Sequence, residues 1–299
     1  MALRDRLVKI YTSGREKGSN RGVHYDGVTV ERNIRYGERK LQTFSLYRKS
    51  ERVLPIIINF HGGGVAGRNK NIRRGFCVWL ASNLDAAVLN VEYRGEANLG
   101  AKECLKEGEK LLAYLKESHK SLALDVDKVL FVGDGVGAYI SSSLAAVAPS
   151  YDIRVLGVVG FSGLYDVIKH AKENQYYSTQ YHFLKKFFKV DLKRAADRSV
   201  STMLGNMSVT HLVDEDYPPC FIAYSIHDEF LPEQGEAMAK ALMQNRVYCW
   251  QFRVVHENCY YNFHLDKKSR ASNAVMEYLY SFIREALSGG VYRNEYREI

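Results

Sequence analysis

The sequence predicts an α/β fold, with a mostly parallel central sheet and helices on both faces of that sheet. Short apolar runs that are typical of buried strands alternate along the chain with longer segments of helical periodicity. No internal repeat or low-complexity segment interrupts this alternation. A length of 299 residues, with 46% hydrophobic and 25% charged residues, is typical of a globular chain with an ample core. We therefore expect one domain that covers residues 1–299.

The expected elements follow one another in a simple order. The first is a β-hairpin at the edge of the sheet, because residues 27–34 and 40–47 alternate as strands do around a turn at 36–38. Further strands are expected at 55–60, 86–93, 128–132, 154–161, 220–225 and 247–255. Helices are expected at 72–83, 101–118, 136–148 and 269–287. Strands that are separated by helices in this way pair in parallel.

One segment breaks the alternation. Residues 166–218 contain no clear strand, favour helix, and are rich in basic and aromatic residues, among them Tyr176, Tyr177, Tyr181, Phe183, Phe187 and Phe188. We expect a helical cap at about 167–217, inserted between two core strands and covering an apolar pocket at their ends. The alternative is an ordinary helical excursion that packs on the sheet.

Composition excludes several function classes. The net charge is +8, but basic residues are interleaved with acids and form no dense tract, so we expect no nucleic-acid partner. The five cysteines are scattered without metal-type spacing, which favours reduced thiols in the cytoplasm and indicates no metal. No apolar signal core or membrane span is found, and no cofactor is expected. The sequence leaves the oligomeric state open.

The sharpest motif is the run His61-Gly62-Gly63-Gly64, which directly follows the apolar residues 54–60. A buried strand that ends in this way places backbone N–H groups, unobstructed by side chains, at its carboxyl end. Such groups stabilise the oxyanion that develops during acyl transfer. A plain glycine-rich turn is the alternative interpretation.

The second motif lacks the residue that would make it catalytic. The strand at 128–132 runs into Gly133-Asp134-Gly135-Val136-Gly137, a strand–elbow–helix pattern in which the central residue is normally a nucleophilic serine. Gly135 offers no hydroxyl, and glycine is expected to relax the strained turn. The N–H of Val136 adds a third oxyanion donor to those of Gly63 and Gly64.

An acid and a base complete acyl-transfer chemistry. Asp228 follows the buried strand at 220–225, and we assign it as the acid that orients the base. A helix-capping aspartate is the alternative. Two histidines, His256 and His264, follow the strand at 247–255, and neither lies at the expected spacing.

Together these residues resemble the hormone-sensitive-lipase-like branch of the α/β-hydrolase esterases. That branch carries His-Gly-Gly-Gly, then Gly-Asp-Ser-Ala-Gly at the elbow, an Asp-containing loop and a His-x-Phe segment. The resemblance runs from about residue 54 to the C-terminus and implies the α/β-hydrolase fold. It also implies that His61 to Gly64 form the oxyanion loop, that Asp134 precedes the nucleophile position and that Asp228 is the triad acid.

The resemblance also implies that two triad members are missing. Gly135 stands at the serine position. Aligning His-x-Phe on Phe263 puts Tyr261 at the histidine position, with His264 as an alternative base.

Three functions remain open. The first is a catalytically impaired carboxylesterase-like homologue that binds a small ligand bearing a carbonyl or carboxylate group. The second is an active carboxylic-ester hydrolase that uses an unrecognised nucleophile or His264 as base. The third is a scaffolding protein.

Overall fold

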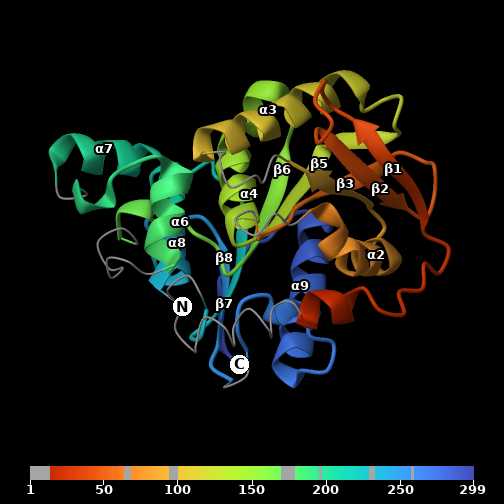
Figure 1. Cartoon of the computed structure of the whole chain (residues 1–299). Coiled ribbons are helices and arrows are strands. Elements are labelled where there is room, and N and C mark those ends of the chain that lie inside the picture. Colours follow the sequence, from red (N-terminus) through yellow and green to blue (C-terminus); the bar gives the residue numbers. More distant parts are fainter. Residues whose placement is uncertain are drawn as a thin grey trace.

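The computed structural model describes residues 14–63, 69–93, 100–169, 179–194, 197–228, 233–256 and 259–299. At its centre these residues form a sheet in the order β1-β2-β4-β3-β5-β6-β7-β8-β9, with helices on both faces (Figure 1). The strands are β1 (Thr29–Arg35), β2 (Thr43–Arg48), β3 (Leu54–Phe60), β4 (Ala87–Glu92), β5 (Leu124–Asp134), β6 (Val155–Phe161), β7 (Cys220–Ser225), β8 (Cys249–Val254) and β9 (Glu295–Glu298). The expected α/β class is confirmed.

The sheet is parallel except at one edge. There β1 pairs with β2 and β2 with β4, both antiparallel, so the edge hairpin is confirmed. From β4 to β9 all pairs are parallel. β9 was not expected, because its four residues are mostly exposed and charged and carry no apolar pattern. It is recognisable only from its pairing with β8, in which Glu295 lies opposite Trp250.

Two helical layers cover the sheet. Alternate side chains of β3 separate the layers: Ile56 and Ile58 face one core cluster, and Ile57 faces the other. The first cluster includes residues of α3 (Ala101–Ser118), α4 (Val136–Val147) and α8 (Glu233–Gln244), and the second includes residues of α2 (Arg74–Asn83) and α9 (Arg270–Ser288).

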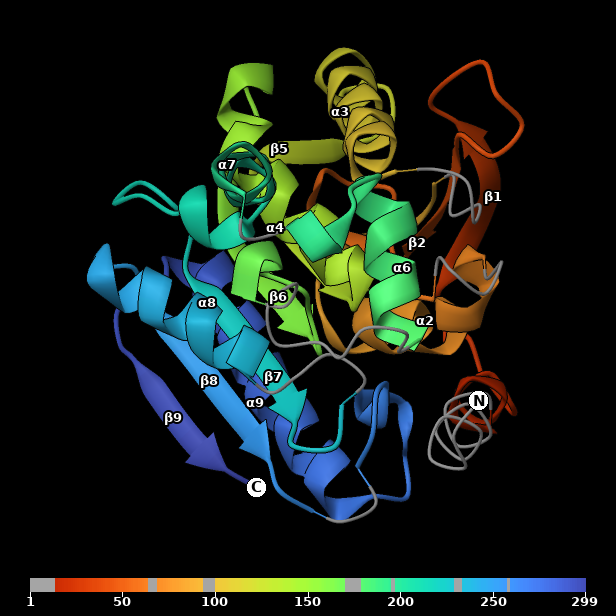
Figure 2. The same ribbon diagram turned by 60° about the vertical axis from the view of Figure 1, so that its left-hand side comes forward.

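The described part of the segment between β6 and β7 contains helices and no strand, as expected. It contains α6 (Thr179–Phe188) and α7 (Arg198–Asn206). Phe187 and Phe188 of α6 each pack edge-on against Tyr139 of α4 at 5.7 Å between ring centroids, and Figure 2 shows α6 beside α4. The aromatic residues therefore fix this insertion to the helix that follows the elbow. Tyr176 and Tyr177 lie outside the described residues.

The described residues carry no helix long and apolar enough to cross a membrane. In the same ranges no group of three or more histidine, cysteine or acidic residues is arranged to hold a metal ion. All five cysteines are buried free thiols.

Candidate functional site

The elbow keeps the backbone conformation of a nucleophile turn although it carries no nucleophile. β5 ends at Asp134, α4 begins at Val136, and Gly135 between them has φ 54° and ψ −117°. The Gly135 N–H donates to Phe161 O at 2.9 Å, and the Tyr139 N–H donates to Gly135 O at 3.2 Å. These two bonds fix the turn to β6 and to α4, and the expectation that glycine relieves the strain of the turn stays a prediction. Glycine adopts the left-handed φ without the strain that a Cβ would add.

Tyr261 occupies the space into which a side chain at Gly135 would project. A Cβ atom added to Gly135 would lie 2.8 Å from the hydroxyl oxygen of Tyr261, which is closer than van der Waals contact. A Cβ atom added to Gly62 would overlap the same hydroxyl. The Tyr261 hydroxyl therefore lies between the glycine loop and the elbow. Three residues singled out in the sequence are thus brought together.

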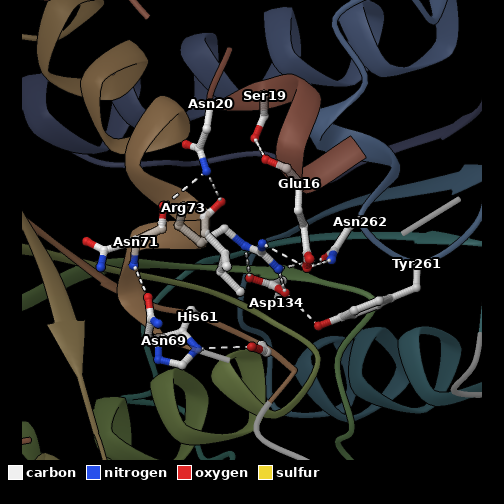
Figure 3. A network of polar contacts seen from close by, with 12 residues as sticks. Glu16, Ser19, Asn20, His61, Asn69, Asn71, Arg73, Asp134, Tyr261 and Asn262 are labelled. Carbon is white, nitrogen blue, oxygen red and sulfur yellow. Dashed lines mark hydrogen bonds and ion pairs between the residues drawn. The ribbon is translucent and has the colours of Figure 1, made fainter. Parts of the chain in front are cut away.

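Asp134 and Arg73 hold Tyr261 in this place (Figure 3). The Tyr261 hydroxyl donates to Asp134 Oδ2 at 2.6 Å. Arg73 donates to the same carboxylate in a two-point contact, with Nε 2.8 Å from Oδ1 and Nη2 2.5 Å from Oδ2. Burial alone would raise the pKa of Asp134, but the charge and hydrogen bonds of Arg73 lower it to about 2. Asp134 is therefore an ionised acceptor for the tyrosine hydroxyl.

A second layer of polar residues completes the network around Arg73. Arg73 Nη2 donates to Asn262 Oδ1 at 2.9 Å, and Arg73 Nη1 lies 3.3 Å from Glu16 Oε1. Asn262 Nδ2 also donates to Glu16 Oε1, at 2.9 Å. The side chains of Arg73 and Glu16 are 0% and 7% exposed, so their ion pair is shielded from water. None of these three residues was identified from the sequence, although a buried aspartate at the elbow implies a cationic partner.

The first residue of the glycine loop is held by the end of β4. His61 Nε2 lies 3.2 Å from Glu92 Oε1, and the other oxygen of Glu92 accepts from the Lys70 N–H at 3.1 Å. One buried carboxylate thus joins the two ends of the loop. The ring of Tyr93 stacks on that of His61 at 4.7 Å, and its hydroxyl donates to His61 O at 2.5 Å. His61 was identified as a site residue from the sequence, whereas Glu92 and Lys70 were not.

The expected oxyanion donors are described in part. Gly63 has φ 78°, a conformation that favours glycine, whereas Gly64 lies outside the described residues. Val136 is the first residue of α4, and no side chain caps this helix. The N–H groups of a first helical turn have no partner within the helix, so Val136 is available as a donor to a ligand. The assignment of an oxyanion hole stays a prediction.

Asp228 lies in the loop after β7, as expected, and is 6% exposed. Its Oδ2 accepts from the Ser225 N–H at 2.9 Å, and its own N–H donates to Ser225 O at 3.1 Å. The carboxylate thus orders its own loop. Its assignment as triad acid stays a prediction.

His264 packs against aromatic side chains of the core cluster that contains residues of α2 and α9. Its ring stacks on Phe161 at 4.1 Å and meets Phe76 edge-on at 5.5 Å. Burial lowers the pKa of His264 to about 3. Its Nδ1 has no hydrogen-bond partner among the described residues. A buried imidazole with so low a pKa is a weak base, which argues against His264 as the base of a triad.

The solved structures that are similar to this chain include esterases. Esterase B from Lactobacillus rhamnosis, inhibited in its crystal structure, is similar over 95% of this chain and 97% of its own, with a TM-score of 0.71 and 19% identity. A bacterial heroin esterase is similar over 93% of this chain and 90% of its own, with a TM-score of 0.76 and 17% identity. At these identities the likeness shows the fold.

Sequence comparison gives the family. The AB hydrolase superfamily protein C1039.03 of Schizosaccharomyces pombe is 28% identical over 91 residues, which are 30% of this chain and 27% of that protein. The chain therefore spans well under two thirds of this curated relative. The model of the alpha/beta hydrolase fold family matches residues 57–265, from β3 to the segment that carries Tyr261 and His264. This chain belongs to the α/β-hydrolase fold family, and its fold is carboxylesterase-like.

Proposed function

We propose that this chain is an α/β-hydrolase homologue that does not hydrolyse esters and instead binds a small ligand bearing a carbonyl or carboxylate group. The observation that carries this proposal is the pairing of Gly135 with Tyr261. The elbow is intact, its central residue has no side chain, and a tyrosine hydroxyl lies 2.8 Å from where a Cβ would be. Ester hydrolysis by this fold needs a nucleophile at that place.

Tyr261 is a poor substitute for a serine nucleophile. Its hydroxyl already donates to Asp134, and a carboxylate whose pKa is lowered to about 2 withdraws that proton only weakly. His264, the alternative base, is packed between Phe161 and Phe76. The surroundings of these residues therefore favour binding over turnover.

The ligand class follows from the groups that remain at the elbow. Uncapped N–H groups at the start of α4 favour an anion or a carbonyl oxygen, because of both hydrogen bonding and the helix dipole. Leaving such donors unpaired away from water costs about 1–3 kcal/mol each. Short acyl or aryl carboxylates supply the missing acceptor. They would bind beneath the insertion at 167–217, with a carboxylate oxygen near Gly63 and Val136.

Calorimetry with a panel of short aliphatic and aromatic carboxylates tests this assignment. The wild-type chain is expected to bind members of the panel, and Asp228→Asn is expected to bind them about three- to tenfold more tightly, because a buried carboxylate repels an anion. Asp127→Asn is the control, since it removes an exposed carboxylate near the start of β5, away from the elbow. Absence of binding to all three forms, or binding that Val136→Pro leaves unchanged, would contradict the proposal.

A further inference from the structure

The N-terminal helical segment 14–19 packs against the loop that carries Tyr261. Arg15 Nη1 donates to Tyr260 O at 3.4 Å, and Arg15 Nε lies 3.5 Å from Asp266 Oδ2. The guanidinium group also lies over the ring of Tyr260, 6.0 Å from its centroid. Arg15 and Tyr260 are thus in contact although 245 positions separate them in the chain. The loop at 259–266 is therefore ordered in part by the opposite end of the chain.

Glu16 makes the central contact of this packing. Its Oε1 accepts from Asn262 Nδ2 at 2.9 Å and lies 3.3 Å from Arg73 Nη1 (Figure 3). Asn262 has φ 65°, a left-handed conformation that asparagine tolerates better than most residues, and it directly follows Tyr261. Glu16 therefore fixes the residue next to Tyr261, while Asp134 fixes the Tyr261 hydroxyl.

Asn20, just after the segment, is anchored on the short 3-10 helix Lys70–Arg73 and on the start of α2. Asn20 Oδ1 accepts from the Gly75 N–H at 2.8 Å, and Asn20 Nδ2 donates to Asn71 O at 3.0 Å and to Ile72 O at 3.2 Å. These backbone groups lie within two residues of Arg73. The segment, the start of α2, the elbow and the loop at 259–266 thus form one closed circuit of hydrogen bonds.

We propose that Glu16 is a positioning residue that sets the place of Tyr261 beside Gly135 by holding Asn262 and Arg73. The inference goes beyond the proposed function and does not depend on it, because it concerns how the site is held rather than what it binds. The side chains of Glu16, Arg73, Asn262 and Tyr261 are all buried, so water does not replace a hydrogen bond that is broken among them. Removal of the Glu16 carboxylate therefore loosens the loop rather than being compensated by solvent.

This arrangement couples the docking of residues 14–19 to the position of Tyr261 beside Gly135. Local segments can open at lower free energy than core strands do. When residues 14–19 undock, Asn262 and Arg73 each lose the Glu16 carboxylate, and the backbone next to Tyr261 is held less firmly. Coupling of this kind is reciprocal, so a change at Tyr261 must also weaken the docking of the segment.

Native-state hydrogen exchange tests the proposal on the 299-residue chain. The reporters are the Phe263 N–H, which donates to Tyr260 O at 2.9 Å, and the Leu265 N–H, which donates to Asn262 O at 3.0 Å. Glu16→Ala is expected to speed their exchange by about tenfold or more, because it removes hydrogen bonds to a charged group. Glu16→Gln keeps an acceptor and is expected to have a smaller effect. Lys17→Ala, an exposed change on the same segment, is the matched control and leaves exchange unchanged.

The reciprocal arm uses Tyr261→Phe, which removes only the hydroxyl. It is expected to speed exchange at the Arg21 N–H, which donates to Gly18 O at 3.1 Å. In every variant the amides of β5 and β6 should exchange as in the wild type. The proposal is overturned if Glu16→Ala leaves the Phe263 and Leu265 amides unchanged. It is equally overturned if exchange rises by the same factor in the core strands, because Glu16 then supports the fold as a whole.

Discussion

The double variant Gly135→Ser/Tyr261→His is expected to hydrolyse short p-nitrophenyl esters at least about a hundredfold faster than the wild type, whereas neither single change does so. A general base contributes about 10²–10⁴ to such a rate, and it does so only when a nucleophile is beside it. The double change supplies both groups. It also removes the tyrosine hydroxyl from the space that the new serine needs. Steady-state turnover with p-nitrophenyl acetate and butyrate measures the gain.

The single variants fail for different reasons. In Gly135→Ser the new Cβ comes 2.8 Å from the Tyr261 hydroxyl, and a residue with a Cβ at φ 54° adds about 1–3 kcal/mol of strain. Tyr261→His supplies a base with no nucleophile to activate. The matched control is Gly135→Ala/Tyr261→His, which has the same backbone strain and the same histidine but no hydroxyl. Full activity in Gly135→Ser alone would show that another base, such as His264, serves the elbow.

Replacing His264 by a residue that does not titrate is expected to make the free energy of unfolding depend less steeply on pH under acidic conditions. Burial lowers the pKa of His264 from 6.5 to about 3, so between these values the unfolded chain binds a proton that the folded chain does not. The stabilising contribution is fully present above pH 6.5 and is lost as the pH falls toward 3. It amounts to about 3 kcal/mol between neutral pH and about pH 4.

Urea unfolding of the wild type and His264→Phe at several pH values measures this contribution. Phenylalanine preserves the stacking on Phe161 but does not titrate. The free energy of unfolding of the wild type, relative to that of His264→Phe, should therefore fall as the pH is lowered from about 7 to about 4. His24→Phe is the control, because that histidine is exposed in the loop before β1. If the free energy of unfolding falls equally with pH in the wild type and in His264→Phe, then His264 is solvated in the folded chain.

Patterns local in sequence were enough to predict the architecture and the elbow. The alternation of apolar runs and helical segments indicated the strands at 55–60 and 220–225 and the helix at 101–118, because each buries a continuous face. The motif around Gly135 identified the turn, since only a few residues and one geometry are compatible with a strand that passes directly into a helix. The neighbouring strand β6 and helix α4 hold the turn through backbone hydrogen bonds, which the motif alone does not reveal.

Contacts between distant segments were beyond reach of the sequence. Arg73, Glu16 and Asn262 belong to no motif. They come together at Asp134 only because the segment 14–19, the 3-10 helix before α2 and the loop at 259–266 converge at the elbow. Glu92 likewise binds His61 from a neighbouring strand. A buried aspartate predicts that some cation lies beside it, but the choice among 42 lysine and arginine residues requires the fold.

The central claim is that the unmodified chain has no esterase nucleophile, and labelling with a fluorophosphonate probe tests it most directly. Such a probe reacts with an activated serine and leaves an intact-mass increase that can be assigned to one residue. The wild type is expected to remain unlabelled under conditions in which Gly135→Ser/Tyr261→His is labelled at residue 135, and its ester turnover should not exceed what an oxyanion hole alone provides, about 10³–10⁴ over water. Stoichiometric labelling of any residue of the wild-type chain, accompanied by turnover that the label abolishes, would contradict the account.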